Sequence, residues 1–197
     1  MARKTFDSLV SAAGLLLVAV LLVAGGLLVW TSSYINNEVH TQLAAQQIYF
    51  PAANSSAVAA PEFQSMRQYG GQLMTTGAQA EVYADHFIAN HLKVIGGGKT
   101  YAQLSTESIA QPTNTKLATQ VSTVFKGETL RGLLLNAYAF GTVGMIAGIA
   151  AVVAFVGAGL LLVLCLLGIR HARKTKSTEE LLHSDATVLR ELETVGV

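Results

Sequence analysis

The stretch LVSAAGLLLVAVLLVAGGLLVW, residues 9–30, carries no ionisable side chain. Crossing a hydrocarbon core of about 30 Å takes about 20 apolar residues in a helix, so this stretch has the length of one crossing. A second uncharged stretch, LLLNAYAFGTVGMIAGIAAVVAFVGAGLLLVLCLLGI, occupies residues 133–169. It is too long for one crossing and too short for two, so we expect an interfacial start and then a crossing from Gly141 to Gly168. The pair predicts an all-α integral membrane protein with two transmembrane helices.

Basic residues near the two stretches indicate which side each end faces. Arg3 and Lys4 lie in the short segment 1–8 before the first stretch. The basic residues that follow the second stretch, within the tail 170–197, are Arg170, Arg173, Lys174 and Lys176. Because dense basic residues mark the cytoplasmic side, we predict a cell-membrane protein with both termini cytoplasmic and residues 31–132 as an extracytoplasmic domain. The rings expected at the outer membrane interface are those of Trp30, Tyr34 and Tyr138.

A cleaved signal peptide is the alternative for the first stretch, because Arg3 and Lys4 precede it and Ala24-Gly25-Gly26 supplies small residues. The apolar run continues to Trp30, which exceeds the usual core of about 7–15 residues in a signal peptide. An uncleaved anchor is therefore favoured.

Residues 31–132, between the two apolar stretches, contain several sequence patterns that predict helices. Residues 31–48 have apolar positions at four-residue intervals and predict a continuation of the first transmembrane helix. Thr76-x-x-Gln79 and Thr100-x-x-Gln103 are capping boxes that begin two helices, ended by Gly96-Gly97-Gly98 and by Pro112. The apolar face predicted for the first of these helices consists of Ala80, Ala84, Phe87, Ile88, His91, Leu92 and Ile95.

Two shorter predictions complete the exterior domain. In the second capped helix, Tyr101 and Leu104 are expected to point inward. Residues 116–125 predict one more amphipathic helix, after which Gly127 leads toward the second span. We find no strand-like alternation of any length, so the extracytoplasmic domain is predicted to be helical throughout.

The composition of the chain argues against several classes of function. The net charge of +1 gives no overall field that would recruit nucleic acid. The single cysteine, Cys165, lies inside the second apolar stretch, so the exterior domain has no disulfide and the chain no cysteine-type zinc site. No charged residue lies within either crossing, which argues against a transporter acting alone. We expect no cofactor and no nucleic-acid partner.

Two segments, YADHFIANHLKVIGGGKTYAQLS (83–105) and GETLRGLLLNAYAFGTVG (127–144), together with the start MARKTFDSLV, resemble an uncharacterised actinobacterial family of two-span membrane proteins. The resemblance covers nearly the whole chain and implies an envelope location without a mechanism. Some relatives carry the name aromatic ring-opening dioxygenase.

Ring-opening chemistry would need iron held by two histidines and a carboxylate. The only cluster of suitable residues is Glu81, Asp85, His86 and His91. On a straight α-helix His86 and His91 are separated by about 140° of rotation, so one metal cannot bind both. We therefore predict neither a metal site nor a catalytic site, and a packing role for His91. The run Gly96–Thr100 also lacks the spacing of a phosphate loop.

The second apolar stretch is rich in small residues, which let membrane helices approach closely. The predicted helix-packing residues are Gly144, Ala147, Gly148, Ala151, Ala154 and Ala158. Two interpretations stand side by side: this seam packs against the first span of the same chain, or it binds another copy or a larger membrane complex.

The cytoplasmic tail predicts a basic membrane-proximal cluster that touches anionic lipid, followed by an acidic amphipathic helix. The apolar face of that helix, a possible partner-binding surface, consists of Leu181, Val188, Leu192 and Val195.

We expect a non-enzymatic envelope protein, an assembly, accessory or scaffold subunit that contacts membrane lipid and self-associates or binds a protein partner through the second transmembrane helix. The alternative is an extracytoplasmic sensor or ligand-binding module that signals through a partner, since two spans enclosing a helical exterior domain also occur in receptors. An extracytoplasmic enzyme is the weakest interpretation, because no nucleophile elbow or carboxylate pair is recognisable.

Overall fold

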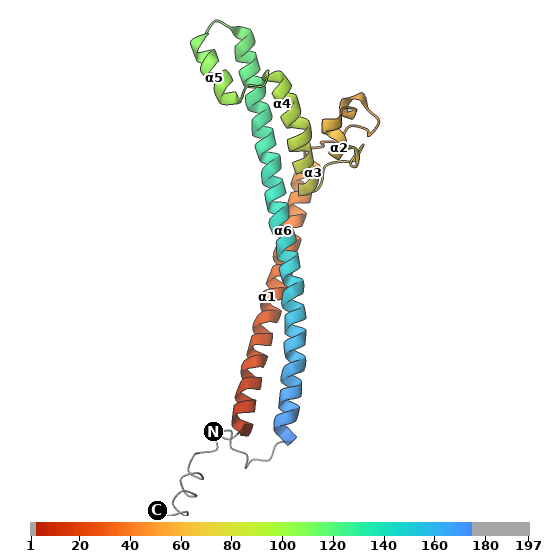
Figure 1. The fold of residues 1–197 in the computed structure, drawn as a ribbon, viewed down its shortest axis with the longest axis vertical. Helices are drawn as coiled ribbons and strands as arrows, with labels where there is room; N and C mark the ends of the chain where they lie inside the picture. The colour runs from red at the N-terminus through yellow and green to blue at the C-terminus, as the bar shows by residue number, and fades with distance from the viewer. Residues whose placement is uncertain (1–2, 175–197) are drawn as a thin grey trace, which may run out of the picture. The chain divides into compact units, whose positions relative to one another are not determined.

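The computed structural model describes residues 3–174, and within that range it is all-helical, as predicted (Figure 1). The α-helices are α1 (Arg3–Ala45), α2 (Gln64–Arg67), α3 (Gly77–Val82), α4 (Ala89–Ile95), α5 (Tyr101–Ala110) and α6 (Thr115–Lys174). Three shorter elements are the 3-10 turns η1 (Ser56–Val58) and η2 (Pro61–Phe63) and the π-helical turn η3 (Tyr83–Ile88). Lys176 and the predicted tail surface at Leu181, Val188, Leu192 and Val195 lie outside the described residues.

The chain forms two compact units, which we call the terminal unit (Met1–Val29 with Ile149–Val197) and the central unit (Trp30–Gly148). Helices α1 and α6 each contribute one part to each unit. Both helices are long and apolar enough to cross a membrane.

In the terminal unit, α1 and α6 pack antiparallel, because Gly14 approaches Cys165 whereas Gly25 approaches Phe155. A methyl group on Gly25 would lie 3.0 Å from Cζ of Phe155. Residues with small side chains fill the contact between the two helices, and Ala158 is almost fully buried there. The large apolar side chains point outward instead, as shown by Leu16, which is 71% exposed. This distribution is the reverse of that in a water-soluble helix pair and is typical of helices that face lipid.

The main hydrophobic core of the central unit joins α1 to the loop that follows it. Leu43 of α1 packs in this core with Phe50, Val58, Met66 and Met74, all of which are almost fully buried. The loop is closed by backbone bonds, in which the N–H of Phe50 donates to the carbonyl of Gln72 at 2.9 Å. Gathering these apolar side chains under the loop is what orders a segment that has little secondary structure.

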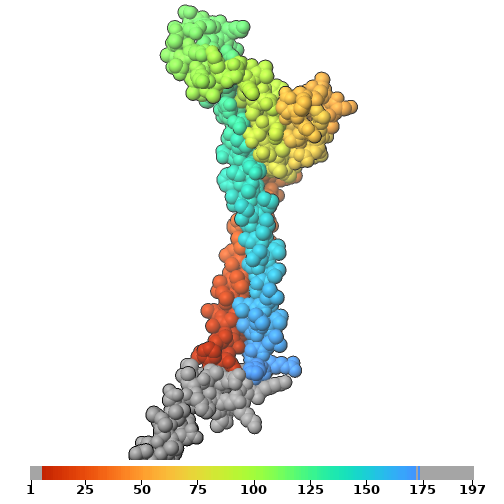
Figure 2. Space-filling model, viewed as in Figure 1, coloured from red at the N-terminus to blue at the C-terminus, as the bar shows by residue number. Residues whose placement is uncertain are grey.

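Arg67 also holds this loop in place through hydrogen bonds to its backbone. Its guanidinium donates to the carbonyls of Val58 and Ala59, at 2.9 and 2.6 Å. Figure 2 shows this loop, in orange, and the turn containing α5, in green, as two separate lobes of the central unit.

The helix predicted to begin at Thr76 is present with both bonds of its capping box, and it ends before Gly96 as expected. Gly97 and Gly98 take φ values of 58° and 79°, the left-handed region that glycine adopts without a steric cost. The assumption of a straight α-helix was wrong, however, because residues 83–88 form the π-helical turn η3. The rotation calculated between His86 and His91 therefore does not describe this helix.

The second capping box, at Thr100 and Gln103, also has both bonds, and α5 ends at Ala110 before Pro112. The helix predicted at residues 116–125 is present as the start of α6, which continues without a break through Gly127. A methyl group on Gly127 would collide with the side chain of Leu92. The glycine is thus a point of close contact between α6 and α4 and does not interrupt the helix.

Candidate functional site

Within the central unit, Gly144 and Gly148 of the small-residue seam of α6 pack against α1. The hydroxyl of Ser32 donates to the carbonyl of Gly144 at 2.7 Å, and the amide of Asn36 donates to the Ser32 hydroxyl at 3.4 Å. A methyl group on Gly148 would lie 3.0 Å from Oγ of Ser32. Ala147, Ala151 and Ala158 are buried, and Ala154 is half-buried. Gly144 and Gly148 thus contact α1 of the same chain just past the predicted first span, which ends at Trp30. Both interpretations of the seam stay predictions.

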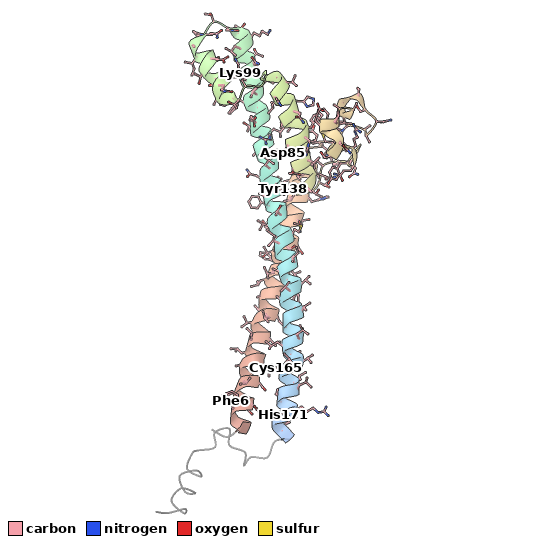
Figure 3. All side chains as sticks on the ribbon, viewed as in Figure 1. Phe6, Asp85, Lys99, Tyr138, Cys165 and His171 are labelled. Carbon is pink, nitrogen blue, oxygen red and sulfur yellow. The ribbon has the colours of Figure 1, made fainter. Side chains whose placement is uncertain are left out.

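The aromatic residues predicted at the outer interface are exposed. Trp30 is 66% exposed and Tyr34 is 57% exposed, and their rings stack with centroids 5.8 Å apart. Tyr138, on α6, is 41% exposed and is labelled in Figure 3. At the other end of α6, Arg170 and Arg173 are exposed, and Lys174 is the last residue of the helix.

Two of the four residues weighed as metal ligands, Asp85 and His91, have other contacts. Asp85 accepts hydrogen bonds from Nη2 and Nε of Arg131, at 2.8 and 3.2 Å, which ties η3 to α6 (Figure 3). The hydrogen bond from Asp85 raises the pKa of Arg131 above its ordinary value. His91 packs against the rings of Phe63 and Phe87, with centroids 5.7 and 4.3 Å away. Across residues 3–174 no three histidine, cysteine, aspartate or glutamate side chains are grouped to hold a metal ion.

A cavity of about 360 Å³ with a mixed polar and apolar wall lies between α1, the start of α3 and α6 in the central unit. Asn36 and His40 line it from α1, and Tyr138 and Thr142 line it from α6. The cavity has no carboxylate, lysine or arginine in its wall, so its chemistry suits an uncharged molecule with polar and apolar parts. Sequence reasoning missed this cavity, because its residues are far apart in the chain and carry no motif.

An apolar groove of about 350 Å³ runs between α1 and α6 in the same unit. Tyr34 and Ile35 line it from α1, and Phe140 and Val143 line it from α6. Glu38 is half-buried in its wall and is the one charged residue there.

The end of α4, the helix α5 and the beginning of α6 form a small lobe, residues 93–127, which we call the α5 lobe. Its own core is limited to Leu104, Leu117 and Val124, with Val121 beside them. Its exposed apolar side chains are Val94 (82%), Ile95 (40%), Tyr101 (38%), Ile109 (79%) and Phe125 (53%).

The inward orientation predicted for Tyr101 was therefore wrong, whereas Leu104 is buried as predicted. Ile95, which was placed on the apolar face of its helix, is exposed as well. The ring of Tyr101 lies beside that of Phe125, with 5.4 Å between centroids. Four lysines against one glutamate also give the lobe a net charge of +3. The one glutamate, Glu107, pairs with Lys99 at 2.6 Å, whereas Lys93, Lys116 and Lys126 form no ion pair with any residue of the described chain.

The comparisons add no identity. No family model matches the chain, and neither a curated protein nor a solved structure resembles it at a significant level.

Proposed function

We propose that this protein is a non-enzymatic assembly or accessory subunit of an envelope complex, anchored by two transmembrane helices and docking a protein partner through its α5 lobe. The observation that carries the proposal is the exposure of Val94 and Ile109, which are 82% and 79% exposed on a lobe with a core of three buried residues. Exposed apolar side chains on such a small core are typical of a surface that a partner completes.

Membrane insertion is supported by the terminal unit. Val153 and Leu160 are 66% and 64% exposed, whereas Ala151 and Ala158 are buried, so the apolar surface faces outward. Water would penalise that surface by about 25 cal/mol for each Å² exposed, and a hydrocarbon core would not. With the basic residues at the chain ends in the cytoplasm, the central unit and its α5 lobe lie outside the cell membrane.

The charge of the lobe defines the partner surface. Lys93, Lys116 and Lys126 are exposed on the same lobe as these apolar residues and have no acidic partner in the described chain. The partner therefore presents an apolar patch with an acidic rim.

A photo-reactive amino acid at position 109 tests the proposal in native membranes. Irradiation of the Ile109 variant should give one discrete adduct, and the same group at the exposed Gln68 should give none. An adduct of twice 20.8 kDa identifies a second copy, and any other discrete mass identifies a different protein. Lys116→Glu should reduce the yield by reversing one charge of the rim. Absence of an adduct at positions 94 and 109 alike would contradict the proposal.

The second candidate is a ligand-binding sensor, and the cavity lined by Asn36, His40 and Thr142 is the observation that favours it. Thermal melting of the full-length protein in detergent, against a panel of uncharged polar envelope molecules, provides the test. A ligand that raises the melting temperature should lose its effect in Asn36→Ala and keep it in Asn54→Ala, which lies outside the cavity. A flat response over the whole panel would remove this candidate.

A further inference from the structure

The cavity of about 360 Å³ in the central unit has one end that lies close to the proposed crossing. On α6 its wall extends from Tyr138 to Met145, a rise of about 10 Å along the helix axis. Met145 is a large apolar side chain, is 57% exposed, and comes just before Gly148, where the central unit ends. Asn36 of α1 lies at the same end, because a methyl group on Gly144 would lie 3.2 Å from its Oδ1.

The other end of the cavity is polar. The start of α3 closes it, since a methyl group on Gly77 would lie 3.0 Å from the Cα atom of Tyr138. Thr75 and Thr76 line this end from the segment before α3, and His40 lines it from α1, one helical turn after Asn36. The cavity therefore changes along its length, with hydroxyl groups and an imidazole at one end and Met145 at the other.

The charge and hydrogen-bonding capacity of the wall select the ligand. No carboxylate, lysine or arginine lines the cavity, so nothing there would offset the charge of a phosphate, a sulfate or an ammonium removed from water. Threonine hydroxyls, the amide of Asn36 and a neutral imidazole each offer both a donor and an acceptor. Neutral hydroxyl groups of a ligand also donate and accept, and they match this wall.

We propose that the cavity binds an uncharged amphiphile of the outer leaflet, a sugar headgroup that carries an alkyl chain. The sugar ring lies near His40 and Thr75, and the chain passes Met145 toward the proposed crossing. The volume is near the lower end of the range for ligand pockets, about 300–1,000 Å³, and suits a headgroup with the first methylene groups of its chain. This inference rests on the membrane insertion proposed above and gives the second candidate function its class of ligand.

An octyl glucoside with a photo-reactive diazirine in its alkyl chain tests the proposal. Full-length protein is placed in nanodiscs of phosphatidylcholine, because a sugar-based detergent would itself occupy the cavity. The yield of labelled protein is measured after irradiation, with and without three unlabelled competitors: hexyl glucoside, glucose and hexyl sulfate.

Hexyl glucoside should halve the labelling at a concentration at least ten-fold below that of glucose, since the burial of two methylene groups supplies that factor. Hexyl sulfate has the same chain and a charged headgroup. It should compete at least ten-fold less well than hexyl glucoside, because the wall has no cation to pair with the sulfate.

Two pairs of variants locate the site. Asn36→Asp places a charge in the wall and should reduce the labelling several-fold, whereas Asn37→Asp places it on the next residue, which is exposed outside the cavity, and should not. Thr142→Val removes one hydroxyl and keeps the shape of the side chain, so hexyl glucoside should compete about three-fold less well. Thr129→Val is its control, since both hydroxyls donate to a carbonyl one turn earlier in α6 and only that of Thr142 belongs to the cavity.

The outcomes separate this inference from the proposals that it rests on. Competition by glucose at the same concentration as hexyl glucoside would overturn the amphiphile and leave the ligand-binding candidate standing. Equal competition by hexyl sulfate would overturn the uncharged headgroup. Labelling that neither Asn36→Asp nor Thr142→Val changes would mean that the probe reacts from the bilayer, which overturns the cavity site with insertion intact. Absence of all labelling would overturn insertion and the cavity site together.

Discussion

Leucine in place of Gly144 should destabilise this protein by about 2 kcal/mol. A methyl group at that position would lie 3.1 Å from Cγ2 of Ile35 and 3.2 Å from Oδ1 of Asn36, which leaves no room for the rest of a leucine side chain. Overpacking of this kind costs about 1–3 kcal/mol. Replacing a helical glycine offsets about 0.5–1 kcal/mol of that cost.

Separation of the helices would also break the hydrogen bond from Ser32 to the Gly144 carbonyl, which is 2.7 Å long. In membrane helices such a bond contributes about 0.6 kcal/mol on average. Added to the overpacking cost and set against the helix-propensity gain, it brings the expected loss to about 2 kcal/mol.

Two glycines of the same helix serve as controls. A methyl group on Gly132 or on Gly159 has no heavy atom within 4 Å, so leucine there meets open space. Both controls should be neutral or slightly stabilising, because they gain helix propensity without a clash. The free energy of unfolding is obtained from the loss of helicity in mixed micelles of a mild detergent and dodecyl sulfate. Light scattering gives the mass of the protein particle.

Two results would refute the reasoning. If Gly144→Leu unfolds within about 0.5 kcal/mol of Gly132→Leu, the contact with Ile35 does not stabilise the fold. If the particle mass falls instead, with the unfolding free energy unchanged, the seam joins two copies of the chain and does not join α1 to α6.

Three further perturbations test other contacts. Gly14→Ala should destabilise the terminal unit because its methyl group would collide with the thiol of Cys165, and a double-mutant cycle with Cys165→Ala should recover most of the loss. Asp85→Asn should cost less than about 1 kcal/mol in denaturant titrations, and less still in high salt, because its ion pair with Arg131 is about one-third exposed at both side chains. Burial raises the pKa of Tyr83 above 10.0. The neutral phenol therefore contributes its full share to stability below about pH 10, and that share is lost as the pH rises through the pKa of the folded state. Melting temperatures between pH 9 and pH 11.5 should fall more steeply for the wild type than for Tyr83→Phe.

Much of the fold could be predicted from the sequence because its signals are local. The capping boxes at Thr76 and Thr100 need only a hydroxyl and an amide three residues apart, and both form as expected. The two long apolar helices follow from composition alone. The π-helical turn at residues 83–88 carries no such local signal, so the helix containing His86 and His91 was expected to be regular.

The candidate sites could not be predicted, because they depend on contacts between distant segments. Gly127 is the place where α6 touches Leu92, a contact that no local pattern in the sequence indicates. Ile95 and Tyr101 fit an amphipathic pattern and are nevertheless exposed, since the α5 lobe has too few residues to cover both sides of its helices.

Salt concentration tests the contribution of the lysines to docking at the α5 lobe. Lys93, Lys116 and Lys126 are exposed, so their attraction for an acidic partner is screened when the Debye length falls from about 8 Å at 0.15 M to about 3 Å at 1 M salt. Raising the salt to 1 M should therefore reduce the photo-adduct at position 109 several-fold. An adduct of unchanged yield at 1 M salt would mean that the exposed apolar side chains bind the partner without help from the lysines.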